Sequence, residues 1–534
     1  MSQMNTNQAI SMTKLLPVVV VAVILLLTAT AHAAAPGITG PNFALTAGPN
    51  FISQPDGSMI YSWGYGCTGG AAGGFLPAAI SGATCPTMQV PGPTLIVNQN
   101  DTVTVTLTNN LPASAGNTSI LFPGFTLTGT SGGVPGVLTQ EAAHNSTVTY
   151  TFTATTPGTR AYYSGTQGDL QVEMGLYGAI IVLPTGLSSS LCPNDPNEQT
   201  ARGVVGEQDF RLAHALYNRA DTCYDREYLF QFSEIDPKIH RQAEEQVAAL
   251  ASCVVSATNP CTLNVVTEPY HPAYFMINGR SMPDDMDPNY AVQYPHQPYN
   301  GNPHMHPGEL VLLRVIGQGR WQHPFHEHGN HVRILARDGN LILSPDGTKL
   351  AGPLLFTTTT TPGLAMDGIF YWTGKGLNWD VFAHNSGNDP GCSPDANGYN
   401  SNASAPNYYE WCQDHLKALE KAPFGDVGSN GPVTLPDPNI LFDGPWFGGS
   451  PYLGPEPHSR ANSGAVTIPP SGTVANDPTS EAGFAYMWHS HNEREITTNN
   501  IFPGGMMMMM LVDPWGNSNP STGTVYGFLI NEAN

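Results

Sequence analysis

Glycine and proline divide this chain into short apolar segments, which limits the folds that it can adopt. Among its 534 residues are 57 glycines and 47 prolines, and only 11% of the residues are charged. Between these breaks, runs such as 102–107 (TVTVTL) and 147–152 (TVTYTF) alternate with period two, as half-buried β-strands do. Long helical bundles are therefore excluded, and the repeated short strands indicate an all-β sandwich or barrel.

The strand-like segments fall into two sets, which predict two tandem domains. We expect the first domain at 40–185 and the second at 223–515, joined by a linker at 186–222. Residues 516–534 are expected to form a C-terminal tail. Each set contains enough apolar residues for a core of its own.

Two regions interrupt the strand pattern of the second set. At 237–252 apolar residues recur near helical spacing, which predicts a short helix. The stretch 375–480 is rich in glycine, proline and asparagine, with a second short helix expected at about 408–421. We interpret 375–480 as a loop-rich insertion, and a degenerate third domain is the alternative.

The first 33 residues have the pattern of an export signal peptide. Lys14 precedes an apolar run at 15–27, and the small-residue pattern at 31–33 predicts cleavage after Ala33. The run is shorter than the roughly 20 residues that a membrane-spanning helix needs, although an uncleaved anchor is the alternative. No later segment is long and apolar enough, so we expect no membrane span in the mature chain. The protein is then secreted or periplasmic.

The charge balance excludes one class of partner. The chain has 19 lysines and arginines against 41 acidic residues, which gives a formal charge of −22. Nucleic-acid binding depends on basic side chains that neutralise phosphates, so nucleic acid is not expected as a partner.

Eight cysteines in an exported chain indicate four disulfides. Many connectivities are formally open, but the spacing favours pairing between sequence neighbours. A thiolate metal site is the competing interpretation, and the absence of any Cys-x-x-Cys motif disfavours it. The predicted bridges are Cys67–Cys85, Cys192–Cys223, Cys253–Cys261 and Cys392–Cys412.

The most informative histidines gather in two strings, HPFHEHG at 323–329 and WHSHNE at 488–493. Side chains two positions apart on a strand lie on one face. If the two strands are neighbours, two such pairs converge on one point, which suits copper, with zinc as an alternative. The four predicted ligands are His326, His328, His489 and His491.

Other polar residues near these strings have weaker signals. His304 and His306 precede a Pro-Gly turn, so we expect them to be exposed. The carboxylates of Glu327, Glu493 and Glu495 could orient the ring nitrogens, although Glu495 could equally be solvated.

A run of methionines at 506–510 allows two interpretations. On a strand, alternate members face opposite ways, which predicts a strand buried on both faces. The alternative is copper ligation, because thioethers favour Cu(I).

The histidine strings resemble those of the multicopper oxidases, whose domains are of the cupredoxin type. Further matches run through both predicted domains: PGPTL (91–95), NDTV (100–103), GLYG (175–178), ING (277–279), LRVI (313–316) and GMM (505–507). The resemblance implies tandem cupredoxin-like Greek-key β-sandwiches. It also implies copper chemistry, since the family uses four histidine motifs to hold one blue copper and a three-copper cluster that reduces dioxygen.

The chain departs from the family at all but one of these motifs. It has ILFPG at 120–124 where the family has Ile-His-Trp-His-Gly, and YYSG at 162–165 where the family has Tyr-His-Ser-His. The family's His-Cys-His is HSH at 489–491, with no histidine about five residues later. A Ser490 hydroxyl cannot replace the thiolate of a blue copper site. His323 matches the histidine of the family's blue copper site. It stays a candidate ligand, although the cysteine and the later histidine that would share the copper ion with it are absent.

By resemblance, at most half of the three-copper cluster remains, enough for one copper ion or two. We therefore expect a copper-binding protein without the full oxidase cycle, which would store or buffer metal or serve an envelope redox partner. An active copper-dependent oxidoreductase is the second hypothesis. The third is a metal-free structural or interaction module in which Leu121, Pro123 and Tyr163 fill the former metal cavity. A homo-oligomer is compatible with all three, and no substrate is indicated.

Overall fold

The computed structural model describes most of the two predicted domains. The described residues are 35–78, 80, 82–192, 211–256, 258–375, 392–402, 408–413, 449–452, 483–513, 517–518 and 525–526. The predicted signal peptide, most of the predicted insertion and most of the predicted tail lie outside these residues. None of the helices in the described part is long and apolar enough to cross a membrane.

The first set of strands forms a β-sandwich of two five-stranded sheets. One sheet has the order β3-β2-β6-β10-β7 and the other β11-β12-β5-β1-β4, with a small β8–β9 ribbon and helix α2 (Gly168–Gln171) beside them. The strands are β1 (Gly37–Thr39), β2 (Asn42–Ser53), β3 (Met59–Cys67), β4 (Phe75–Leu76), β5 (Leu95–Asn98), β6 (Thr102–Asn109), β7 (Leu127–Gly132), β8 (Val134–Pro135), β9 (Gln140–Glu141), β10 (Thr147–Thr153), β11 (Gly158–Tyr163) and β12 (Tyr177–Leu183).

The alternating runs behave as their sequence predicts. Strands β6 and β10 pair antiparallel, so that Val105 lies opposite Tyr150 and both side chains enter the core. Their threonine neighbours point to the other face, and Thr106 and Thr149 share a hydrogen bond of 3.0 Å between hydroxyls. One face of the sheet is apolar because the side-chain period matches the pleat.

The second set of strands forms a second sandwich. One sheet has the order β14-β13-β16-β22-β18-β19, with β20 on β18, and the other has the order β15-β25-β24-β17-β21, with β23 on β24. The strands are β13 (Arg226–Ile235), β14 (Tyr274–Ile277), β15 (His304–Met305), β16 (Leu310–Gly317), β17 (His323–Glu327), β18 (Val332–Arg337), β19 (Asn340–Leu341), β20 (Leu354–Leu355), β21 (Thr357–Thr360), β22 (Ala365–Tyr371), β23 (Gly449–Tyr452), β24 (Gly483–Ser490) and β25 (Met507–Val512). A separate ribbon joins β26 (Asn517–Ser518) and β27 (Val525–Tyr526). The expected all-β tandem architecture is confirmed.

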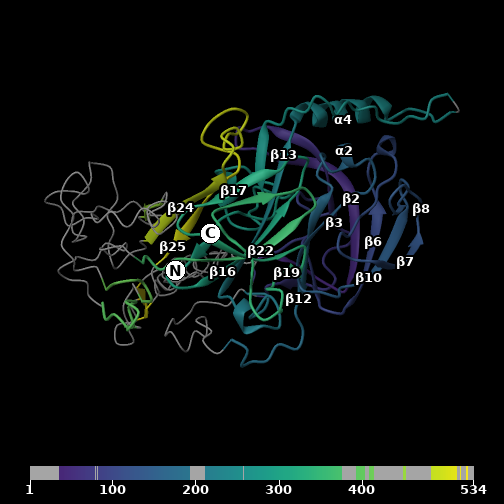
Figure 1. Ribbon diagram of the computed structural model, residues 1–534. Helices are drawn as coiled ribbons and strands as arrows, with labels where there is room; N and C mark the ends of the chain where they lie inside the picture. Colours follow the sequence, from purple (N-terminus) through teal and green to yellow (C-terminus); the bar gives the residue numbers. More distant parts are fainter. Residues whose placement is uncertain are drawn as a thin grey trace, which may run out of the picture.

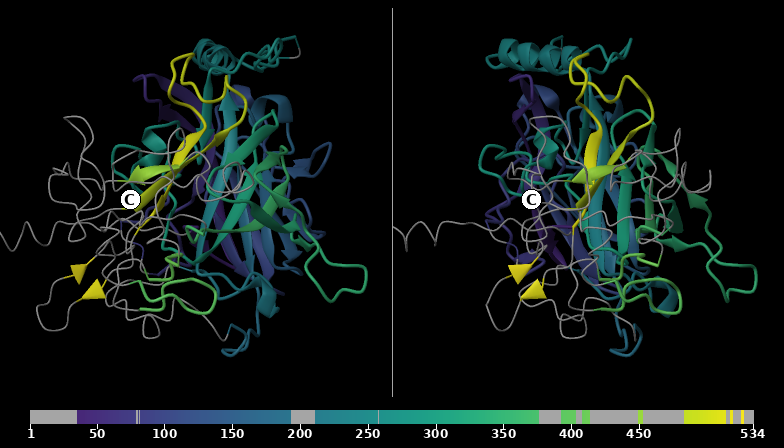
Figure 2. Two further views of the ribbon diagram at one scale, coloured as in Figure 1. Left: turned by 60° about the vertical axis from the view of Figure 1, so that its left-hand side comes forward. Right: turned by 90° about the vertical axis from the view of Figure 1, so that its left-hand side faces the viewer.

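The four large sheets lie as successive layers (Figure 1). Strand β11 of the first sandwich contacts β16 and β22 of the second, and the buried Arg314 side chain links the two. Its guanidinium donates to Thr159 of the first sandwich at 3.0 Å and to Glu227 at 2.8 Å. The sheet that contains β17, β24 and β25 is therefore the layer farthest from the first sandwich, and β24 and β25 face the viewer in the right-hand view of Figure 2.

The helix expected at 237–252 is confirmed as α4 (Pro237–Leu250). Asp236 caps its first turn by accepting a hydrogen bond from the Lys238 amide, and Pro237 suits the first helical position. Ile239 and Ala243 pack into the core of the first sandwich, against which the helix lies.

The prediction of a second helix at 408–421 is wrong for residues 408–413, the part of this range that the structure describes. Residues 408–413 form turns in which Trp411 pairs with Tyr399 and donates its amide to the Thr373 carbonyl. The disulfide Cys392–Cys412 fixes this loop against the preceding segment. The backbone of the loop therefore bonds to other segments and not within a helix. Residues 414–421 lie outside the described chain.

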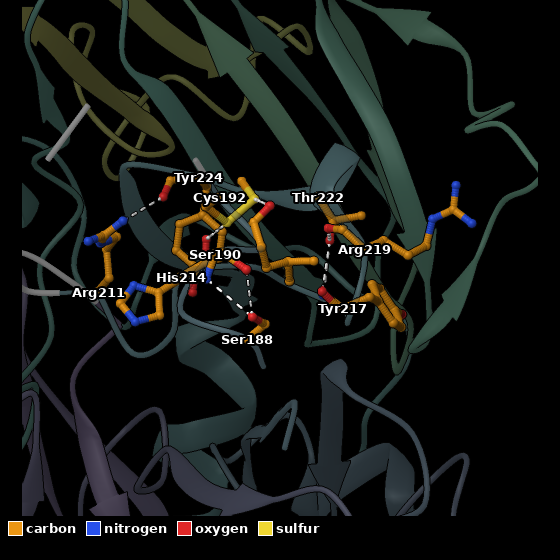
Figure 3. The surroundings of a disulfide bond; sticks show 11 residues. Ser188, Ser190, Cys192, Arg211, His214, Tyr217, Arg219, Thr222 and Tyr224 are labelled. Atoms are coloured by element: carbon orange, nitrogen blue, oxygen red, sulfur yellow. Dashed lines mark hydrogen bonds between the residues drawn. A yellow bond between two sulfur atoms is a disulfide. The ribbon is translucent and has the colours of Figure 1, made fainter. Parts of the chain in front are cut away.

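All four predicted disulfides are confirmed, and together they use every cysteine of the sequence. Figure 3 shows the surroundings of Cys192–Cys223, which joins the predicted linker to the start of the second domain. Beside it, the Arg211 guanidinium donates to the Tyr224 carbonyl at 3.1 Å. No thiol remains for metal ligation, because each sulfur is already bonded.

Candidate metal centre

The two histidine strings lie on neighbouring antiparallel strands, β17 and β24. Their register places His326 directly opposite His489 and Phe325 opposite Ser490. Opposite residues share one face of a sheet, so the histidines of both strings project together. The sequence prediction depended on this adjacency, which spacing alone could not establish.

Three of the predicted ligands form a compact cluster. One ring nitrogen from each of His326, His328 and His489 lies within 4.8 Å of the others. All three side chains are at most 9% exposed. A buried group of imidazoles within this distance of one another is a geometry that holds a copper or zinc ion.

The contact between His328 and His489 tests whether a metal fits. Their Nε2 atoms are 3.2 Å apart, while Nδ1 of His489 donates to the Ser490 carbonyl at 2.7 Å. Two imidazole nitrogens bound tetrahedrally at ~2.0–2.1 Å from one ion are about 3.3 Å apart. The pair therefore has the spacing of two metal ligands, and the tautomer of His489 leaves Nε2 available for a metal.

His491 lies at the margin of this cluster. Its ring centroid is 4.7 Å from that of His326 and 5.9 Å from that of His489, and its side chain is exposed. It therefore contacts the cluster from its exposed side.

The surroundings of His326 and His489 disfavour protonation of these two rings. Burial, followed by the neighbouring rings of His328 and His489, lowers the pKa of His326 to about 3. Burial also lowers the pKa of His489. Because a metal binds only the deprotonated nitrogen, rings with a low pKa are ready to act as ligands.

The histidine face points away from the first sandwich. The alternate residues Phe325 and Trp488 fill the core between the two sheets of the second sandwich, so the histidines occupy the outer face.

The segments at 120–124 and 162–165, where the resemblance implies histidines, lie in the first sandwich. Phe122 packs in the core of the first sandwich against Tyr150 and Phe152, and Leu121 pairs with Tyr163.

The structure separates His323 from the other predicted ligands. Both of its ring nitrogens are taken by carboxylates: Nδ1 donates to Glu495 and Nε2 to Glu234, each at 2.9 Å. The Ser490 hydroxyl also donates to Glu495, and all four side chains are buried. Where the resemblance implies a blue copper ion, this protein holds a hydrogen-bonded row of Ser490, Glu495, His323 and Glu234.

This row is charged rather than neutral at its centre. Burial opposes a charge on His323, but the hydrogen bonds that the ring donates to Glu234 and Glu495 outweigh this effect and raise the pKa of the ring to about 9. Glu234 also accepts backbone amides from Arg320 and Trp321 at 2.7 and 2.8 Å, which stabilise the carboxylate. An imidazolium between two carboxylates offers no free nitrogen to a metal.

The structure decides two expectations about neighbouring residues. Of the two alternatives for Glu495, it supports the orientation of a ring nitrogen, because the buried carboxylate accepts from Nδ1 of His323. The expectation for the other two residues is wrong. His304 and His306 are not exposed, because the short strand β15 pairs with β25 and buries them. His304 donates to the Asp513 carboxylate at 2.6 Å. The sequence does not reveal this partner, because Asp513 lies 209 residues farther along the chain.

Part of the chain is similar in sequence to known proteins. Residues 83–186, within the first sandwich, match the family model described as multicopper oxidase. This stretch of the chain is similar to a multicopper oxidase domain. The curated multicopper oxidase MCE of Talaromyces pinophilus is 35% identical over 98 residues, which cover 18% of this chain and 15% of that protein. The matched stretch of the multicopper oxidase domain contains the two segments that lack the family's histidines.

Several solved structures of the family also resemble this chain. The multicopper oxidase mgLAC is 16% identical, with a TM-score of 0.42 and coverage of 88% of this chain and 85% of the other. The blue copper oxidase of Nitrosomonas europaea is 14% identical at a TM-score of 0.41, with the same coverage. The fold assignment itself rests on the sheet topology described above.

Proposed function

We propose that this protein is an exported copper-binding member of the multicopper oxidases that lacks the blue-copper oxidase cycle. It holds one copper ion through His326, His328 and His489, with His491 at the exposed side. The observation that carries this proposal is the cluster of three buried ring nitrogens within 4.8 Å of one another. Its four disulfides suit the oxidising environment of a secreted or periplasmic protein.

Two features argue against electron entry through a blue copper site. The first is that all eight cysteines are bonded in disulfides, so no thiolate remains, and Ser490 stands at the cysteine position. The second is the carboxylate-bound imidazolium of His323, which occupies the position of the family's blue-site histidine. When bound, copper would supply a Lewis-acid or redox centre to the cluster, while the surrounding residues hold the rings in place.

Metal loading of the purified protein tests this proposal. After incubation with Cu(II) and removal of excess metal, we expect one copper ion per chain without the intense blue colour of a copper–thiolate bond. Zn(II) is the comparison metal, because the same ring nitrogens fit it. A protein that retains neither metal would contradict the proposal and favour a metal-free module, whereas a blue product would contradict the absence of a thiolate site.

A further inference from the structure

The methionines of β25 divide between two environments. Met506, Met508 and Met510 pack into the core of the second sandwich, and so form one of the two buried faces that the sequence predicts for this strand. Met507 and Met509 point to the opposite face, which also contains the histidine cluster. Neither side chain belongs to the hydrophobic core of the described chain.

The strand register groups these two thioethers with two residues of β24. His489 lies directly opposite Met507, and Met487 lies directly opposite Met509. Cross-strand pairs have Cβ atoms about 4.5–5.5 Å apart, and neighbouring pairs on one face lie about 7 Å along the strand. The four side chains therefore occupy the corners of one small rectangle on the outer face of the sheet, which we call the β24–β25 quartet.

Burial marks the quartet as a sheltered site. Met507 is only 3% exposed, and Met487 and Met509 are half-buried.

The chemistry of the quartet differs from that of the histidine cluster. Thioethers are soft, uncharged ligands that select Cu(I), whereas imidazoles also bind Cu(II) and Zn(II). His489 lies at the border of the two groups, because its Nε2 faces His328 and its strand position lies opposite Met507.

We propose that the three thioethers of the β24–β25 quartet, those of Met487, Met507 and Met509, form a second binding site, selective for Cu(I), which adjoins the histidine cluster at His489. The ring nitrogens of His489 serve other partners, because Nδ1 donates to the Ser490 carbonyl and Nε2 faces His328. The inference rests on the proposed function because the two sites meet at His489. It adds an oxidation state to that function: this protein takes up reduced copper.

Anaerobic titration with Cu(I) against a coloured Cu(I) chelator tests the site. We expect Met507→Leu and Met509→Leu each to weaken Cu(I) binding at least about tenfold, as loss of supporting groups at metal sites does. Zn(II) binding to the histidine cluster should stay unchanged in both variants. Met508→Leu is the matched control, because it alters the adjacent side chain that points into the core. Such volume-conserving exchanges leave the fold intact.

The outcomes separate this inference from the proposed function. X-ray absorption of the Cu(I)-loaded protein should show sulfur ligands that diminish in Met507→Leu but not in Met508→Leu. If Zn(II) binds and the outer-face variants retain wild-type Cu(I) affinity, the quartet is overturned while the histidine site stands. A wild-type protein that binds neither ion overturns both.

Discussion

Replacement of His489 by alanine is expected to abolish tight copper binding. His489 contributes one of three clustered nitrogens, and its Nε2 lies 3.2 Å from that of His328. Only two of the three clustered imidazoles then remain, with the exposed His491 ring beside them. We expect the affinity for copper to fall about 100-fold, the upper end of the roughly 10–100-fold loss typical when a supporting group at a metal site is removed. Calorimetric titration with Cu(II) measures this loss directly.

A stability measurement gives the same prediction a second readout. A ligand at about 100 times its Kd stabilises the native state by about 2.7 kcal/mol, so copper should raise the Tm of the wild type but not of His489→Ala. His271→Ala is the control, because His271 is exposed and outside the cluster. An equal rise in Tm for His489→Ala and the wild type would show that copper binds elsewhere.

Replacement of His323 by leucine is expected to destabilise the protein by about 3–5 kcal/mol, because it leaves two buried carboxylates without a counter-charge. Glu234 and Glu495 approach the ring from opposite sides at 2.9 Å, and all three side chains are buried. Chemical denaturation of the metal-free protein at pH 7 measures the loss.

The same interaction predicts a pH dependence. The pKa of His323 rises from 6.5 to about 9 on folding, so its imidazolium contributes stability that is fully present below pH 6.5. This contribution, about 3 kcal/mol, is lost as the pH rises through about 9. Denaturation at pH 6 and pH 10 should therefore differ more for the wild type than for His323→Leu.

His271→Leu controls for the change of side chain at an exposed position. Two results would contradict this prediction. Either His323→Leu is as stable as His271→Leu, or the free energy of unfolding of these two variants falls equally between pH 6 and pH 10. The charged His323 ring would then not stabilise the second sandwich.

The fold was largely predictable from the sequence because its signals are local. Alternation at 102–107 and 147–152 fixes which face of β6 and β10 is buried, and short loops bring paired cysteines together. The helix at 408–421 failed over its described part because the tertiary pairing of Trp411 and a disulfide override local propensity.

The candidate site was predictable only in part because it depends on long-range contacts. The spacing of the two strings predicts two same-face pairs, but their convergence requires the β17–β24 pairing. The partners of His323 come from β13 and from the loop after β24, 89 and 172 residues away. Burial of His304 likewise depends on Asp513, 209 residues along the chain. Pattern alone cannot connect such residues.

Anomalous scattering at the copper absorption edge from crystals of the copper-loaded protein tests the central claim most directly. We expect one strong peak within bonding distance of His326, His328 and His489, and none at His323. A peak beside His323 and Ser490, or no peak at the three clustered histidines, would contradict the account.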